Sequence, residues 1–263
     1  MPGVFSFPLP IQALMAALFT WLLTALGAAM VIFTQRARQT CLDTMLGFGA
    51  GVMLSSAFWS LLEPGIALAD ELHQTGWLVA GTGFLAGGCM MLLGDVLTSR
   101  LSHACLSDGR RRSALLMTSI TLHNIPEGLA VGVAFGALNT APSTAALSAA
   151  WMLALGIALQ NFPEGAAVSL PLRREGMPRR KAFFLGQLSG VVEPMAALTG
   201  SLMAVYIQAL LPFLLCFAAG AMIAVVAAEL IPESQRSAKP SLITLSTLLG
   251  FVIMMALDVS LRV

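Results

Sequence analysis

Long apolar stretches constrain this 263-residue chain more than any other feature of its sequence. From Ile11 to Phe33 there is no charged residue, and from Ala182 to Pro232 the only charged residues are Glu193 and Glu229. A helix that crosses a bilayer needs roughly 20 mostly apolar residues. The first stretch is therefore long enough for one crossing. The second is long enough for two crossings, with a tight turn expected around residues 208–212.

The composition indicates the same class of protein. Charged residues make up 10% of the chain and hydrophobic residues 57%, and the mean hydropathy is +0.85. A soluble domain carries about 25% charged residues, so a water-soluble enzyme is excluded. The near balance of 14 Lys and Arg against 13 Asp and Glu excludes a nucleic-acid-binding protein with a basic face. The four cysteines are widely spaced, which predicts neither a disulfide framework nor a thiolate zinc site.

These stretches predict an all-α integral membrane protein with eight transmembrane helices, forming one domain over residues 1–263. The spans are expected at about residues 11–33, 42–68, 76–97, 113–138, 145–172, 182–207, 210–232 and 240–261. Every Lys and Arg except Arg262 falls in alternate loops, within residues 36–38, 100–112, 173–181 and 236–239. Because cytoplasmic loops are enriched in basic residues, we expect both termini to be extracytoplasmic.

Two matching hexapeptides bring polar and charged groups into the fourth and fifth spans. The sequence HNIPEG occupies residues 123–128, and QNFPEG occupies residues 160–165. An acidic side chain at the centre of a bilayer costs about 3 kcal/mol, so such residues are functional candidates. Since helical residues three or four apart are neighbours on one face, each motif places its polar groups together: His123 and Asn124 with Glu127, and Gln160 and Asn161 with Glu164.

The two hexapeptides are expected to meet near the middle of the bilayer. At 1.5 Å per residue, Glu127 lies roughly 22 Å along the helix from Arg112. Neighbouring spans run in opposite directions, so the second hexapeptide reaches a similar depth, and Glu193 joins both from the sixth span. Imidazole and carboxylate groups suit zinc, iron(II) and manganese. Three close carboxylates would need cations or protons to offset their charge, and two divalent ions would do so.

With these two motifs and a lone glutamate on the sixth span, the chain resembles the ZIP (Zrt/Irt-like) metal transporters, and among them the bacterial GufA-like branch. The resemblance implies a 3+2+3 inverted-repeat arrangement, in which spans six to eight repeat spans one to three around a central pair. Inverted repeats with sites at the midplane are a common transporter plan. The resemblance also implies a homodimer in the inner (plasma) membrane of a bacterium.

The resemblance further implies which side chains hold the metal. The ligands of one ion would be His123, Glu127, Gln160, Glu164 and Glu193, with Met53 contributed by the second span. A second ion would be bridged by the glutamates and completed by Asn124 and Asn161. Some similar proteins have His where Gln160 stands, or Asp where Asn161 stands, so the metal preference and the second ion depend on these two positions.

Glutamates near helix ends suggest where the cation enters and leaves. Glu63 and the following proline end the second span, and Glu229 and Glu233 flank a proline at the end of the seventh. We hypothesise that Glu63 lies at the outer mouth and that Glu229 and Glu233 lie at the inner exit. The alternative is that all three are ordinary interfacial residues of helix ends.

The sequence therefore predicts a transporter, not an enzyme, that admits Zn²⁺ or a related ion (Cd²⁺, Fe²⁺ or Mn²⁺) into the cytoplasm without a prosthetic group. A proton-coupled cation exchanger is one alternative, because carboxylates also carry protons. An intramembrane metallohydrolase is another; it needs an open metal position and a general base. The absence of an HExxH sequence disfavours the hydrolase.

Overall fold

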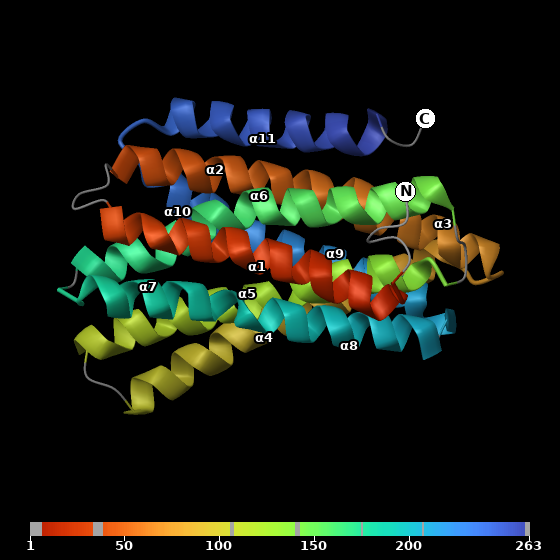
Figure 1. Cartoon of the computed structure of the whole chain (residues 1–263), viewed down its shortest axis with the longest axis horizontal. Helices are drawn as coiled ribbons and strands as arrows, with labels where there is room; N and C mark the ends of the chain where they lie inside the picture. Colours follow the sequence, from red (N-terminus) through yellow and green to blue (C-terminus); the bar gives the residue numbers. More distant parts are fainter. Residues whose placement is uncertain are drawn as a thin grey trace.

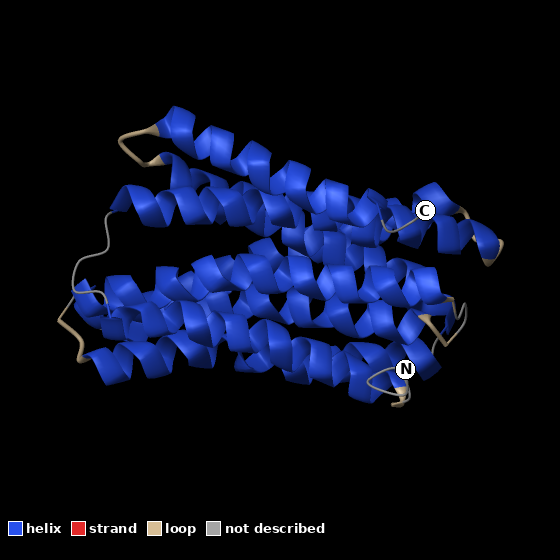
Figure 2. Ribbon diagram, turned by 45° about the horizontal axis from the view of Figure 1, so that its top comes forward, coloured by secondary structure: helices blue, strands red, loops and turns tan. Residues whose placement is uncertain are grey.

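A computed structural model describes residues 7–33, 39–105, 108–139, 143–174, 176–206 and 208–260. Within its helices, the side chains of residues 95, 98, 99, 101–120, 123, 174, 205 and 208 lie outside this description. All the regular structure of the described residues is helical, as predicted (Figure 2).

The described helices form eight rods that lie side by side (Figure 1). Five rods are single helices: α1 (Leu9–Phe33), α4 (Gly76–Cys105), α5 (Asp108–Ala137), α6 (Thr144–Arg174) and α11 (Pro240–Ser260). The second rod consists of α2 (Gln39–Ser55), the π-helix η2 (Ser56–Leu62) and α3 (Glu63–Glu71). The sixth consists of α7 (Arg179–Leu188), the 3₁₀ turn η3 (Ser189–Val191) and α8 (Val192–Tyr206). After the 3₁₀ turn η4 (Gln208–Leu210), the seventh consists of α9 (Leu211–Val225), the π-helix η5 (Val226–Leu230) and α10 (Ile231–Gln235).

The rods overlap all eight predicted spans. In the described part of the chain, 7 rods are long and apolar enough to cross a membrane, and α5, with 30 residues, has the length for the eighth. The turn expected around residues 208–212 coincides with η4. The chain is a multi-pass membrane protein, and α1 begins at the end of the bundle where α11 finishes (Figure 1).

Prolines coincide with the interruptions of the three composite rods. Pro64 follows η2, Pro232 follows η5, and Pro194 lies in the first turn of α8 just after η3. Proline has no N–H to donate, and its ring clashes with the carbonyl four residues earlier, so a regular α-helical turn is disfavoured there. The wider π turn and the tighter 3₁₀ turn are two ways of accommodating this.

Four helix pairs, none of them adjacent in the sequence, make the most extensive contacts. These pairs are α1 with α6, α5 with α8, α4 with α9, and α2 with α11. They divide the rods into two groups, which meet mainly where α2 packs on α6 and where α5 packs on α9. The first group contains α1, α5, α6 and α7–α8, and the second contains α2–α3, α4, α9–α10 and α11.

Glycines let the backbones touch where these pairs cross. A Cβ added to Gly27 of α1 would lie 1.9 Å from the carbonyl oxygen of Phe162, and one added to Gly165 of α6 would lie 2.0 Å from that of Thr24. Each glycine thus packs against the carbonyl three residues before the glycine of its partner helix. The same reciprocal contact joins α2 to α11 and α4 to α9, through Gly51 with Gly250 and Gly87 with Gly220. Small residues allow this close approach in membranes.

Candidate functional site

The first helix group contains a cluster of polar side chains that the sequence predicted as ligands. Each of the six described members is at most 5% exposed to solvent, although the helices that carry them are largely apolar. They are Asn124 and Glu127 on α5, Gln160, Asn161 and Glu164 on α6, and Glu193 on α8. We refer to these six residues as the polar cluster.

A hydrogen bond between Gln160 and Glu127 joins the two hexapeptides. The amide Nε2 of Gln160 donates to Oε1 of Glu127 at 2.6 Å. The sequence predicted that Gln160 lies beside Glu164, one turn further along α6. In the structure the side-chain amide of Gln160 instead donates to Glu127 on α5. The contact brings the glutamate of one hexapeptide against the first residue of the other.

Glu193 is held by side chains from two other helices. Its Oε2 accepts hydrogen bonds from Thr20 Oγ1 on α1 at 2.5 Å and from Asn161 Nδ2 on α6 at 2.8 Å. Among the described side chains, its Oε1 accepts a single long contact of 3.5 Å, from Thr24 Oγ1. Because Oε2 takes two short hydrogen bonds and the contact of Oε1 is at the limit of hydrogen-bond distance, Oε2 is the more firmly anchored of the two oxygens.

Several oxygen atoms of the polar cluster have no hydrogen-bond partner among the described residues. They are Asn124 Oδ1, Glu127 Oε2, Gln160 Oε1, Asn161 Oδ1 and Glu164 Oε2, all buried. Buried polar atoms are normally paired, so five exceptions in one cluster call for a ligand. The carboxyl groups of Glu127, Glu164 and Glu193 also lie close enough for their charges to interact. Amide and carboxylate oxygens of this kind are ligands for divalent cations.

The 3₁₀ turn η3 places Glu193 at the start of α8 and is supported by the cluster itself. The amide Nδ2 of Asn124 donates to the carbonyl oxygen of Ser189 at 2.8 Å. Pro194 has no N–H to offer the carbonyl of Gly190, four residues earlier. The break in the rod therefore follows from Pro194, and Asn124 stabilises it.

Two further predicted ligands, His123 and Met53, are not among the six residues of the polar cluster. His123 lies on α5, but its side chain is outside the described part of the structure. Met53 of α2 is buried in the apolar core. One turn before it, α2 passes close to the cluster, since a Cβ on Gly49 would lie 3.6 Å from Cβ of Gln160. Among the described side chains, which exclude His123, no three of the types His, Cys, Asp and Glu are grouped as a metal site.

The residue predicted at the outer mouth, Glu63, lies where η2 gives way to α3. Glu63 is exposed at the first residue of α3. Close to it in the sequence, the hydroxyl of Ser60 lies 2.8 Å from each carboxylate oxygen of Asp258 on α11. Asp258 is buried, so this end of the bundle holds a polar contact between α11 and the second rod.

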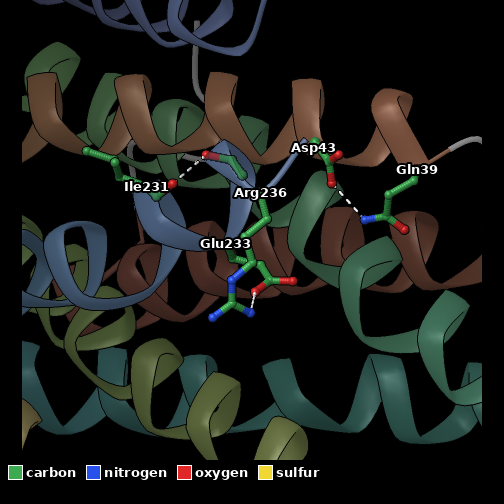
Figure 3. Close-up of polar contacts among 6 residues, drawn as sticks. Gln39, Asp43, Ile231, Glu233 and Arg236 are labelled. Atoms are coloured by element: carbon green, nitrogen blue, oxygen red, sulfur yellow. Dashed lines mark hydrogen bonds and ion pairs between the residues drawn. The ribbon is translucent and has the colours of Figure 1, made fainter. Parts of the chain in front are cut away.

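The residues predicted at the inner exit lie on η5 and α10. Glu229 is half-buried, and its charge acts on Glu164 of the polar cluster. Glu233 is exposed and pairs with Arg236 at 2.7 Å (Figure 3). Beside α10, which packs against α2, the buried Asp43 accepts a hydrogen bond of 2.7 Å from Gln39 (Figure 3).

The pair of Glu233 and Arg236 gives a prediction of a small effect. The two side chains are 55% and 76% exposed, and exposed ion pairs contribute about 0–1 kcal/mol to stability. We expect Arg236→Ala to leave the thermal unfolding midpoint of the detergent-purified protein almost unchanged. A clear loss of stability would show that this pair holds the end of α10 more firmly than an exposed ion pair normally does.

Three polar side chains with a part in these networks were not predicted from the sequence. Thr20 and Thr24 are buried on α1, and Asp43 is buried near the start of α2. Two threonines four residues apart in an uncharged span were the available signal for α1. For Asp43 the signal was an acid at the start of the second span.

Rods of membrane-spanning length around a buried cluster of acids and amides define a multi-pass membrane protein with a polar interior, the architecture of a carrier for ions or polar solutes. Residues 102–258 match the family model described as ZIP Zinc transporter. The chain is 38% identical to zinc transporter ZIP11 of Xenopus tropicalis, over 95% of this chain and 97% of that protein. It is 37% identical to zinc transporter GufA of Myxococcus xanthus, over 94% and 98% of the two chains.

Zinc transporter ZIPB of Bordetella bronchiseptica is 35% identical, over 90% of this chain and 77% of that protein. The chain belongs to the ZIP zinc transporter family. This confirms the resemblance drawn from the two hexapeptides.

Proposed function

We propose that this protein carries Zn²⁺, or a related divalent transition-metal cation, into the cytoplasm through the polar cluster. The observation that carries the proposal is the set of buried oxygens on α5 and α6 that have no partner among the described residues, in the interior of a membrane protein. The names of its relatives, each a zinc transporter, support zinc as the cargo. Membership of this family supports transport and not catalysis.

In this proposal, two cations are held side by side. The implied ligands of the first are His123, Glu127, Gln160, Glu164 and Glu193, with Met53 from α2; Asn124 and Asn161 complete the second. The hydrogen bonds support two centres, because they divide the cluster into a part around Glu127 and Gln160 and a part around Glu193 and Asn161. Glu63 serves the outer mouth, and Glu229 and Glu233 serve the inner exit. The interaction of Glu229 with Glu164 supports the exit.

The rods are arranged, we propose, as a 3+2+3 inverted repeat. A shift of 169 residues carries Gly51 to Gly220 and carries η2 onto η5 to within one residue at each end. The main helix pairs also exchange under this repeat. The pair of α1 with α6 becomes α8 with α5, and the pair of α4 with α9 becomes α11 with α2. Both the shift of 169 residues and the exchange of helix pairs support an inverted repeat that relates spans one to three to spans six to eight.

The orientation of the protein in the membrane follows in this proposal from the distribution of charge. All basic residues but Arg262 lie in alternate loops, which supports a cytoplasmic position for those loops and an extracytoplasmic position for both termini. The bacterial relatives at 35–37% identity support a bacterial inner membrane as the location.

The test is uptake into proteoliposomes that contain the purified protein. We expect zinc-65 to accumulate faster than in protein-free vesicles, and unlabelled Cd²⁺, Fe²⁺ or Mn²⁺ to compete according to its affinity for the site. Absence of metal-specific influx would contradict the proposal. Imposing a pH gradient of either sign tests the alternative of a proton-coupled exchanger. Zinc influx that requires the gradient would favour exchange with protons over uncoupled transport.

A further inference from the structure

The helix α1 supplies side chains to a site that otherwise consists of α5, α6 and α8. Thr20 and Thr24 lie one turn apart on α1 and are almost completely buried. Both direct their hydroxyl groups to the carboxylate of Glu193, at 2.5 Å and 3.5 Å. A polar face toward one carboxylate is unusual on a helix whose residues from Ile11 to Phe33 carry no charge.

The two oxygens of Glu193 are treated differently by their neighbours. In the described part of the structure, Oε2 takes both short hydrogen bonds, from Thr20 and Asn161, whereas Oε1 receives the long contact from Thr24. Gly190 has no side chain to crowd this oxygen, since a Cβ there would lie 3.2 Å from Oε1 and 2.9 Å from Cδ1 of Trp21. A carboxylate fixed through one oxygen presents the other in a defined direction.

We infer that Thr20 is a positioning residue for metal binding: its hydroxyl anchors Oε2 of Glu193 so that Oε1 faces the cation. The inference rests on the proposed function. It adds α1 to the helices whose side chains determine how the metal is bound. Groups that orient a ligating carboxylate in this way contribute strongly to metal affinity. Thr24, at the longer distance, has the smaller effect.

The geometry of Thr20 also suits repeated binding and release. A hydroxyl has a single proton to donate, and Thr20 Oγ1 has two acceptors within reach, Glu193 Oε2 at 2.5 Å and the carbonyl of Ala17 at 2.9 Å. When Glu193 shifts as a cation leaves, the proton of Thr20 can turn to the carbonyl of Ala17. The buried hydroxyl of Thr20 therefore keeps an acceptor when Glu193 moves, and the cost of an unsatisfied buried donor is avoided.

The experiment compares Thr20→Val, which removes the hydroxyl at nearly constant shape, with Thr20→Ser, which keeps it. Zinc-65 binding to the detergent-purified protein gives Kd, and proteoliposome uptake gives KM and the maximal rate separately. We expect Thr20→Val to raise Kd and KM by about 10–100-fold and Thr20→Ser to restore both. The matched control is Thr82→Val, because Thr82 is exposed on α4 and bonds only within its own helix.

Each outcome decides the matter. Unchanged Kd and KM in Thr20→Val overturn the inference, and so does a Thr20→Ser variant as impaired as Thr20→Val, since helix packing would then be the cause. If Thr20→Val does not accumulate in the membrane, Thr20→Ala replaces it with the same expected loss. A wild-type protein that neither binds nor transports zinc would instead reject the proposed function itself.

Discussion

Zinc influx is expected to fall at least about 100-fold when Glu127 and Glu164 are both replaced by glutamine, since loss of a group that merely supports a ligand already costs 10–100-fold. The double variant Glu127→Gln, Glu164→Gln keeps the size of both side chains and removes two negative charges from the polar cluster. Both residues are buried and each has an unpartnered oxygen in the described structure. The measurement is initial zinc-65 uptake into proteoliposomes, corrected for the amount of protein inserted.

The control for this double variant is Glu71→Gln. Glu71 is exposed at the end of α3, far along the second rod from the polar cluster, and we expect normal uptake. Because an uncharged amide in place of a buried carboxylate removes an unfavourable charge, the double variant should be at least as stable as the wild type without metal. Influx that survives in the double variant would show that the cation takes another route.

A large loss of stability is expected from Gly27→Ala. A Cβ at this position would lie 1.9 Å from the carbonyl oxygen of Phe162 and 2.8 Å from its carbonyl carbon. These are backbone atoms, which cannot turn aside as a flexible side chain does, so α1 must move away from α6. Overpacking in a close-packed interior costs about 1–3 kcal/mol or more. Phe162 belongs to the second hexapeptide, so the displacement also reaches the polar cluster.

Gly81→Ala is the matched control, because a Cβ on Gly81 of α4 would meet nothing within 4 Å. We expect the thermal midpoint of detergent-purified Gly27→Ala to fall by several degrees and that of Gly81→Ala to remain unchanged or rise slightly, as alanine favours the helix. Equal midpoints in the two variants would mean that the contact of α1 with α6 is looser than these distances indicate.

The rods could be predicted from the sequence because lipid imposes a simple rule on them. An apolar stretch of sufficient length must become a helix, since no other segment satisfies its backbone in hydrocarbon. The acids at positions 127, 164 and 193 were found for the same reason, as their burial is costly. The interruptions at η2, η3 and η5 were not predicted, because proline permits several local solutions and the surrounding packing chooses among them.

Contacts between helices that are distant in the sequence could not be predicted. The partner of Gln160 is Glu127 on the neighbouring helix instead of Glu164 on its own, because a side chain between two helices bonds to whichever acceptor lies closer. Thr20 was overlooked for a related reason. A threonine in a membrane helix normally bonds to its own backbone, and only the fold brings Glu193, 173 positions later, against it.

The pairing of distant helices has a consequence for the order in which a newly made chain can assemble. Each of the four main pairs joins a helix made early to one made much later. The group with the polar cluster has all its members once the ribosome has passed Tyr206, whereas α2 waits for α11, which ends at Ser260. Until then, Gly51 lacks the helix α11 against whose backbone it packs in the finished protein. Synthesis therefore completes the helix group that contains the polar cluster first and the second group last.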